Sequence, residues 1–486
     1  MPPLSADRVA REDLVTFLNA CFVCTGQSEY YADARGVALS VDFLHAYVAG
    51  NYRRLYARCL AAGINHTNRA AIVLELLAAG SPPDLDDRRE EGALLAATLR
   101  DLPPPRVYRL FHDLGPRRVN NRRARAVVRD YLQGRRDLTL DALKYRPGLR
   151  AAVRHTHPRL PPAIGPFLFP SRRRKKDAPD APTGHRLLDA WQRAAHDREA
   201  VFALPFTVAE GFARQHGIDR AELLTRTAPD MTRAERLRVQ GQAEEAGVDV
   251  ALDFGTVGLT RLARYVLSLP PATREARADE LTAALDAAAR RALRRAPLSL
   301  QRVALVLDRS DSASGSEARS RVPLAVALAV RHLMKAAARE LVVRWTPPLP
   351  DGESTLQGVE AAGQTDLATP LLESLADDLP VDLVLVVSDG YENDPPGGAR
   401  EVLRVFRTHV APARPVSVVH VNPVFDQEAL SPRALGGAIP TVGLREAEDL
   451  PTALGFARFA EGHGTLSELE DYLAARVRDF LHRAPR

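Results

Sequence analysis

The segment QRVALVLDRSDS, residues 301–312, decides the fold of the last third of this chain. It begins with a continuous apolar run that has β-branched content, which is typical of a strand buried on both faces. From there, strand-like and helix-like segments alternate to the end of the chain. Because such alternation indicates a parallel sheet covered by helices on both faces, we predict an α/β domain over residues 301–486. The expected strands lie at 301–308, 341–345, 381–390, 415–422 and 438–444, and the expected helices lie at 323–340, 365–379, 399–410 and 465–483.

Oxygen-bearing side chains stand at the expected carboxyl ends of these strands. The first strand ends at Asp308 and is followed by Ser310, Asp311 and Ser312; Thr365 and Asp366 lie in a middle loop before a helix; and a later strand ends at Ser388 and Asp389. Ligands of open α/β sheets bind beyond the carboxyl ends of the strands, and carboxylate and hydroxyl oxygens suit a small hard cation. The absence of His and Cys around these positions argues against zinc. We therefore predict a divalent metal site for Mg²⁺, against the alternative that these residues are only helix caps and turn residues.

We do not expect an enzyme, because no general base or nucleophile stands beside these oxygen-bearing side chains. His420, near the end of a later strand, is expected to be structural. A metal-dependent nuclease is a third possibility, but the sequence lacks carboxylates for a second metal.

The first two thirds of the chain show helical patterning. In residues 1–155 apolar residues recur at intervals of three and four residues, with short breaks that contain Gly, Pro or Asn. Helices in series without strands favour an α-solenoid of the HEAT type. A Pro-, Gly- and charge-rich loop, which we expect to be mobile, covers about residues 158–186, and helical patterning then resumes to about residue 295. We predict two domains, a helical one over 1–300 and the α/β domain over 301–486.

The distribution of charge points to a polyanion. The net charge is only +5, but residues 101–176 hold 20 Lys and Arg against 5 Asp and Glu, whereas residues 301–486 hold 19 against 26. A strongly basic block in an otherwise balanced chain is the electrostatic footprint of a nucleic-acid partner, although solvated Arg-rich helix faces are also common. The candidate RNA-binding residues in this block are Arg117, Arg118, Asn121, Arg122, Arg125, Lys144, Arg146, Arg150, Arg154, His155 and His157. If the segment is helical, Arg118, Arg122, Arg125 and Arg129 share one face.

The three cysteines and the hydropathy indicate the compartment. Cys21 and Cys24 form a C-x-x-C, but they lie in a helix-like apolar segment and lack a second ligand pair, which favours a packed helix over a zinc or redox site. A small, odd number of cysteines suits a reducing compartment. No apolar run is long enough to cross a bilayer, and no signal-peptide pattern begins the chain. We expect a cytoplasmic protein that does not contact a membrane.

The spacing D-x-S-x-S after the first strand, the Thr-Asp of the middle loop and the later strand that ends in Ser-Asp-Gly resemble the von Willebrand factor A domain and its metal-ion-dependent adhesion site. The resemblance implies a doubly wound, Rossmann-like fold. It also implies that Asp308, Ser310, Ser312, Thr365 and Asp389 are the metal ligands. In that family the open coordination position takes a carboxylate from a partner protein.

The order of the parts adds a second resemblance. The helical part contains the pattern R-x-x-N-N-R-R, the triplet Lys144-Tyr145-Arg146 and the closing His155-x-His157, and the A-like domain follows it. This order resembles the Ro-type ring proteins with a TROVE domain. The resemblance implies helical repeats that close into a ring, a monomer that forms ribonucleoproteins, and binding of misfolded RNA and small non-coding Y RNA. The alternative is a metal-dependent interaction adaptor, docking an acidic protein, without an RNA function.

Overall fold

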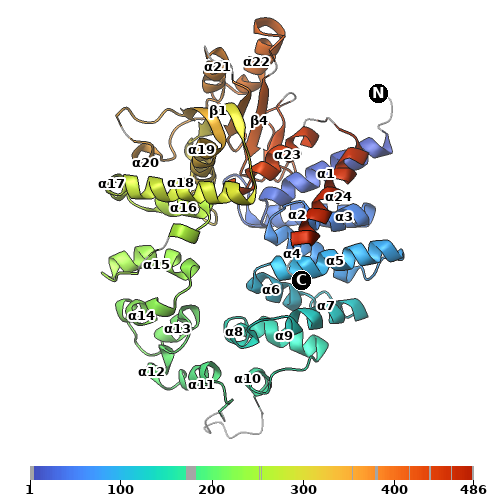
Figure 1. Cartoon of the computed structure of the whole chain (residues 1–486), viewed down its shortest axis with the longest axis vertical. Coiled ribbons are helices and arrows are strands. Elements are labelled where there is room, and N and C mark those ends of the chain that lie inside the picture. Colours follow the sequence, from blue (N-terminus) through green and yellow to red (C-terminus); the bar gives the residue numbers. More distant parts are fainter. Residues whose placement is uncertain are drawn as a thin grey trace. The chain divides into compact units, whose positions relative to one another are not determined.

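The computed structural model describes residues 5–170, 182–250, 252, 254–352, 354–377, 381–414, 416–436, 439–460, 462 and 464–483. The chain forms two compact units, each described by itself. The first, called the sheet unit here, consists of residues 1–69 and 254–482; the second, the helical unit, consists of residues 70–253 with the last four residues. Figure 1 labels the elements of both.

The sheet unit is built on a five-stranded parallel sheet with the order β2-β1-β3-β4-β5. The strands are β1 (Leu300–Asp308), β2 (Ala338–Thr346), β3 (Leu383–Val387), β4 (Ser417–Asn422) and β5 (Thr441–Gly443). The chain moves from β1 outward to β2 and then returns to the other side of β1, so the strand order reverses at β1. In an open α/β sheet the crevice at such a reversal is where ligands bind. The predicted parallel sheet is confirmed.

Helices pack against the sheet because the buried strands present apolar side chains. Ala304, Val306, Val384 and Val386 share one core with α21 (Ala368–Ala376) and α22 (Gly398–Val405). Helix α19 (Val322–Ala337) contacts β1 and β2, and also α16 (Leu259–Ser268) and α18 (Ala278–Arg295). Short connecting helices α17 (Pro271–Ala276) and α20 (Thr355–Gly358) contact each other.

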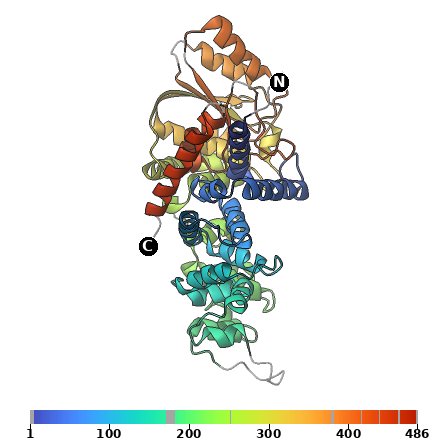
Figure 2. The same cartoon turned by 90° about the vertical axis from the view of Figure 1, so that its right-hand side faces the viewer.

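The N-terminal helices belong to the sheet unit. Helix α1 (Ala6–Val23) runs against β5, where a Cβ atom on Gly443 would come within 2.7 Å of the Asn19 carbonyl oxygen. The rings of Phe22 and Phe456 lie 5.4 Å apart, which joins α1 to α23 (Leu450–Ala460). Figure 2 shows the N-terminal helices, in dark blue, beside the red C-terminal helix. The remaining helices of this part are α2 (Ala34–Asn51), α3 (Arg53–Arg58), the first turn of α4 (His66–Ala78) and α24 (Leu466–Arg483).

The compact units therefore do not follow the predicted boundary at residue 300. Helices that the sequence assigned to the first domain bury apolar faces against the sheet and against α19. The division into domains 1–300 and 301–486 stays a prediction. The two compact units are instead divided after residues 69 and 253.

The helical unit contains helices and no strand among its described residues. Its helices are α5 (Leu85–Asp101), α6 (Pro104–Asp113), α7 (Arg122–Gln133), α8 (Leu138–Lys144), α9 (Arg146–Thr156), α10 (Ile164–Leu168), α11 (Arg186–Arg193), α12 (Arg198–Val201), α13 (Phe206–Ala213), α14 (Arg220–Thr227) and α15 (Arg233–Glu245). Side chains of Asp84, Asn121, Asp137 and Asp219 cap their helices by accepting from backbone N–H groups.

Some expected elements differ in extent. The loop expected over about residues 158–186 contains the short helix α10, because Ile164, Phe167 and Leu168 are buried; its centre, residues 171–181, lies outside the described residues. The helix expected to reach residue 340 ends at Ala337, where β2 begins. The helix expected over 399–410 is α22 followed by a π-helical turn, Phe406–Val410.

Candidate metal centre and basic surface

The first predicted ligand group lies at the end of β1. The Ser310 N–H donates to Asp308 Oδ1 over 2.8 Å, which turns the chain sharply after the strand. The hydroxyl oxygens of Ser310 and Ser312 lie 3.2 Å apart, and all three side chains are buried. A buried carboxylate and two buried hydroxyls are thus gathered in one turn of chain.

Hydrogen bonds hold the middle loop against this turn. The Asp311 N–H donates to the Gly363 carbonyl oxygen over 3.0 Å, and the Gly363 N–H donates to Asp311 Oδ1 over 2.9 Å. The Ala362 N–H donates to the Arg309 carbonyl oxygen over 2.8 Å. Thr365, two residues further on, is buried. Asp311 therefore holds a loop in place, in agreement with its absence from the predicted ligand set.

The third group follows β3. Asp389 Oδ1 accepts from the Tyr391 N–H over 3.0 Å, and the Asp389 carbonyl oxygen accepts from Asn422 Nδ2 over 2.9 Å. The Thr365 N–H donates to Asn393 Oδ1 over 2.9 Å, which ties the middle loop to this one. The structure thus brings the three loops of the predicted site together at the edge where β1 and β3 end.

The electrostatics of this cluster favour a cation. Burial, and next the charge of Asp389, raise the pKa of the Asp308 carboxyl to about 7. Burial also raises the pKa of the Asp389 carboxyl, and the neighbouring Ser312 hydroxyl partly opposes that shift. Two carboxylates that are each about 4% exposed carry an unfavourable desolvation cost unless a positive charge compensates them. A cavity of about 10 Å³, lined by Asp308, Ser388 and Asp389 among others, leaves room for one water-sized occupant.

This donor set fits a small hard cation. Its oxygens come from carboxylates and hydroxyls, the ligands that Mg²⁺ accepts, and one small cavity meets both carboxylates. In the part of the chain that the structure describes, no cluster of three or more His, Cys, Asp or Glu side chains offers another metal site. The thiols of Cys21, Cys24 and Cys59 are buried, and burial raises the pKa of Cys24 to about 12, which disfavours the thiolate that a metal or redox role needs.

His420 has a structural environment. Its ring nitrogens lie 3.0 Å from the Thr441 hydroxyl and 3.1 Å from the Ser388 carbonyl oxygen. Burial lowers its pKa to about 4, so the imidazole is neutral near pH 7. Because both nitrogens are engaged inside the core, this histidine is not placed to move protons at the site.

One contributor to this site was missed by the sequence analysis. The ring of Tyr31, from the loop between α1 and α2, lies 4.0 Å from the ring of Tyr391. Burial, and next the charge of Asp389, raise the pKa of the Tyr31 phenol, and the neighbouring Ser312 hydroxyl partly opposes that shift. No spacing or motif in the sequence links Tyr31 to these residues, which lie about 280 to 360 positions further along the chain.

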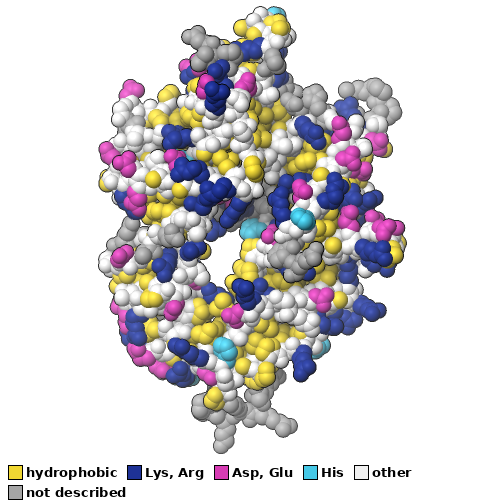
Figure 3. All heavy atoms as spheres, viewed as in Figure 1, with side chains coloured by type: hydrophobic (Ala, Val, Ile, Leu, Met, Phe, Trp, Pro, Cys, Tyr) yellow, Lys and Arg dark blue, Asp and Glu magenta, His cyan; other side chains and the backbone are white. Residues whose placement is uncertain are grey.

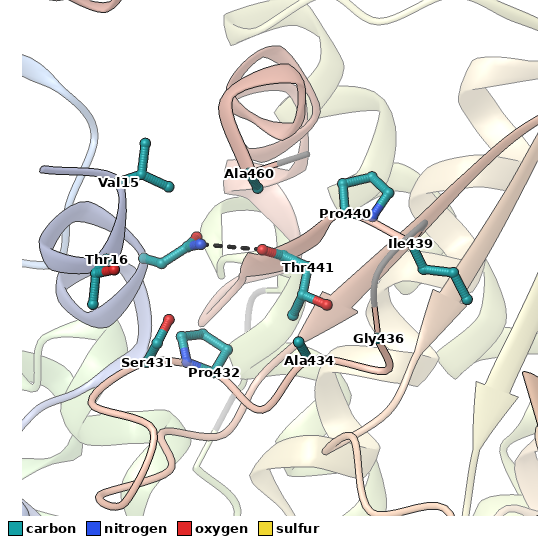
Figure 4. A pocket seen from close by; sticks show the side chains of 11 residues that line it. Val15, Thr16, Ser431, Pro432, Ala434, Gly436, Ile439, Pro440, Thr441 and Ala460 are labelled. Atoms are coloured by element: carbon teal, nitrogen blue, oxygen red, sulfur yellow. Dashed lines mark hydrogen bonds between the residues drawn. The ribbon is translucent and has the colours of Figure 1, made fainter. Parts of the chain in front are cut away.

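A separate hollow of about 260 Å³ lies where α1 meets the loop before β5 (Figure 4). Asn19 Nδ2 donates to the Thr441 carbonyl oxygen across it over 3.1 Å. The side chains that line it carry no ionisable group. It offers no charged side chain to a bound molecule.

The basic block forms a partly exposed surface on the helical unit. Arg122, Arg125 and Arg129 are exposed on α7, and dark-blue side chains are visible on the α7 side of the unit (Figure 3). Arg118 is also exposed, but it precedes the helix and has φ 54°, so the expected shared helical face of four arginines is reduced to three. Asn121 is the N-cap of α7 and also donates to the Leu77 carbonyl oxygen, so its role is structural.

Helix α9 extends this surface. It contacts α7 directly. His155 on α9 is half-buried, and burial, together with the charge of Arg125 on α7, lowers its pKa. The guanidinium groups of Arg150 and Arg154 lie 5.7 and 5.5 Å from the ring centre of Phe169. His157 is exposed and ends the helix in the left-handed region.

Three other candidates have partners inside the unit. Lys144 Nζ lies 3.3 Å from Glu235 Oε1, with side chains 15% and 9% exposed. The Arg146 guanidinium lies over the rings of Phe167 and Trp191, at 4.9 and 4.7 Å. Arg117 pairs with Glu75. Contacts within the protein therefore engage the charges of Lys144 and Arg146, which the sequence analysis had assigned to RNA binding.

An open groove of about 490 Å³ between α6 and α9 was not predicted. Tyr108 and Tyr145 stack with ring centres 5.6 Å apart and line it, and Arg109 and His112 lie exposed on α6 beside it. Its rim also carries Asp113, which lies 3.6 Å from Arg109 Nε. The groove combines an aromatic surface with one guanidinium group, one imidazole and one carboxylate.

No family model matches this chain, and no curated protein matches its sequence. Among solved structures, it is similar to the crystal structure of the Deinococcus radiodurans Ro (RSR) protein, with a TM-score of 0.54 at 15% sequence identity. The alignment covers 93% of this chain and 99% of that chain. No helix among the described residues is long and apolar enough to span a membrane. This chain therefore has the fold of a Ro-type protein over nearly its whole length.

Proposed function

We propose that this protein binds RNA as Ro-type TROVE proteins do, with helical repeats of the HEAT type that present the basic surface. The observation that carries the proposal is the cluster of exposed cations on α7 and α9, in a chain that shares the fold of the Ro protein. Arg122, Arg125, Arg129 and Arg154 face solvent from two neighbouring helices. Guanidinium groups arranged in this way suit a phosphate backbone.

The groove between α6 and α9 supports single-stranded RNA as the ligand. Bases of single strands stack on aromatic side chains, at roughly 1–3 kcal/mol per base. The half-buried ring of Tyr145 lines the groove, and Arg109 stands beside it. Non-coding or misfolded RNA with unpaired segments is the class of partner that this combination fits.

Charge reversal tests the RNA proposal. Arg122→Glu, Arg125→Glu and Arg129→Glu in one chain are expected to weaken binding of a single-stranded RNA at least tenfold, and to lower the salt slope by roughly 2. The control carries the same charge change at exposed arginines outside the basic block, Arg214, Arg339 and Arg404, and should bind as the unchanged protein does. Equal loss in both variants, or no RNA binding by the unchanged protein, contradicts the proposal.

We further infer that the sheet belongs to a von Willebrand A domain whose adhesion site holds Mg²⁺ through Asp308, Ser310, Ser312, Thr365 and Asp389. The bound ion would supply an open coordination position for a partner's carboxylate. The buried carboxylate pair supports this assignment, since a cation would compensate both charges. The neutral, fully engaged His420 favours docking over hydrolysis. Loss of an acidic partner protein on treatment with EDTA, and its return with Mg²⁺, is the result that tests it.

A further inference from the structure

We propose that Tyr31, on the loop between α1 and α2, is part of the metal centre and forms the wall against which a partner's carboxylate is seated. The inference rests on the metal site of the proposed function. It adds a residue from the N-terminal helices to a centre whose predicted ligands all come from the sheet and its loops.

Two anchors hold the loop beside the site. Glu29 forms a buried ion pair with Arg319, whose guanidinium also donates to the Pro423 carbonyl oxygen over 3.1 Å. The Ser316 hydroxyl donates to the Ser28 carbonyl oxygen over 2.7 Å. A buried ion pair with a second hydrogen bond is costly to break, so the loop has a defined position.

The same anchors orient the tyrosine. The Glu29 N–H donates to the Ala32 carbonyl oxygen over 2.8 Å, which folds the two intervening residues, Tyr30 and Tyr31, outward as a tight turn. Arg319 lies just before α19, and Ser316 follows the turn that carries Ser310 and Ser312. The loop is therefore fastened to the segment that also supplies two predicted metal ligands.

Contacts of Tyr31 lead directly to the centre. Its ring lies 4.0 Å from that of Tyr391, at an interplanar angle of 41°. The Tyr391 backbone N–H holds Asp389 Oδ1 over 3.0 Å. The Tyr31 phenol lies near Ser312 and Asp389: burial and the charge of Asp389 raise its pKa, and the Ser312 hydroxyl partly opposes that shift. Tyr31 thus lies beside two different ligand loops.

The exposure of Tyr31 shows that it stands at the mouth of the site. Its side chain remains 51% exposed although it lies near the buried Ser312. A phenol hydroxyl at the edge of a metal centre can donate to the carboxylate oxygen that the metal does not bind. Tyr31 is accordingly a positioning and specificity residue for a carboxylate ligand.

Tyr30 offers a matched control. Its ring packs edge-on against Tyr31, with centres 4.8 Å apart, and its side chain is 45% exposed. Among the residues that the structure describes, Tyr30 makes no hydrogen bond or ring contact with Ser312, Asp389 or Tyr391. Removing the Tyr30 hydroxyl therefore makes the same chemical change one residue away from the proposed wall.

Terbium luminescence tests the placement of Tyr31 in the full-length protein. Tb³⁺ takes the oxygen ligands of a Mg²⁺ site and emits when a nearby tyrosine is excited. We expect Tb³⁺ emission that Mg²⁺ displaces, a reduction of at least about twofold in Tyr31→Phe, and little change in Tyr30→Phe. Equal emission from Tyr31→Phe and the unchanged protein overturns the inference and leaves the metal site standing. Absence of any emission that Mg²⁺ displaces overturns both.

A carboxylate probe tests the seating. Acetate that binds Tb³⁺ displaces coordinated water, which lengthens the emission lifetime. We expect Tyr31→Phe to need a severalfold higher acetate concentration for the same lifetime change, while Tyr30→Phe matches the unchanged protein. If acetate acts equally on all three proteins, Tyr31 does not seat the carboxylate and the proposal is wrong.

Discussion

Asp308 ends β1 and Asp389 follows the neighbouring parallel strand β3; burial, and next the charge of Asp389, raise the pKa of the Asp308 carboxyl. The pairing of Leu307 with Val387 sets this closeness, because it aligns the two strand ends. Two buried acids at a strand-order reversal are costly for the fold by themselves and useful when a cation binds.

Asp308→Asn should abolish stabilisation by Mg²⁺. The amide removes a buried negative charge, so the melting temperature without metal is expected to stay the same or rise, whereas the increase caused by Mg²⁺ should vanish. At about one hundred times its Kd, a ligand stabilises a protein by about 2.7 kcal/mol, which thermal melts with Mg²⁺ and with EDTA resolve. Asp311→Asn is the control, since Asp311 is exposed and holds Gly363. A full Mg²⁺ response in Asp308→Asn would rule out this ligand assignment.

His420 should make the stability fall in mild acid. Its folded pKa, about 4, lies below the ordinary value of 6.5, so the unfolded chain binds more protons between these values. The contribution of His420 to the free energy of unfolding is therefore fully present above about pH 6.5. It decreases as the pH falls toward 4, by at most about 3 kcal/mol. Urea unfolding at several pH values measures this slope. His420→Gln should flatten it; an unchanged slope would mean that other groups cause the acid sensitivity.

Lys144→Met should affect stability more than RNA binding. The substitution leaves Glu235, which is 9% exposed, without its ammonium partner, and we expect a loss of about 1–3 kcal/mol. The salt dependence of RNA binding should be unchanged, because the Lys144 charge already has a partner in the protein. Arg125→Met is the matched comparison, with weaker RNA binding and a nearly unchanged melting temperature. The reverse pattern would place Lys144 in the RNA interface.

Gly148→Ala should disturb the groove between α6 and α9. A Cβ atom at this position would lie 2.7 Å from the Tyr108 carbonyl oxygen, so the two helices would have to separate. We expect a destabilisation of about 1–3 kcal/mol and weaker binding of single-stranded RNA. Gly92→Ala is a suitable control, since a Cβ there has nothing within 4 Å. Unfolding curves and RNA titrations of both variants check this, and equal behaviour would show that the helices tolerate the added methyl group.

The sequence by itself determined the parallel sheet and the loops that meet at its edge. A buried strand such as Val303–Leu307 needs apolar residues on both faces, and its end must carry polar residues where the chain leaves the core. Both requirements are local, so periodicity and spacing reveal them. The helices of the basic block can likewise be predicted from the sequence. The sequence does not distinguish the exposed cationic side chains from those that pair within the protein.

Only the tertiary structure decided which of these residues face solvent and which distant segments join the site. Lys144 and Arg146 resemble the exposed arginines in the sequence, but Glu235 and Trp191, supplied by later helices, engage them. Tyr31 packs against Tyr391 beside the site because a buried ion pair, between residues 290 positions apart, brings two segments together. Long-range packing of this kind depends on the shapes of both surfaces at once, and no local pattern in a single sequence records it.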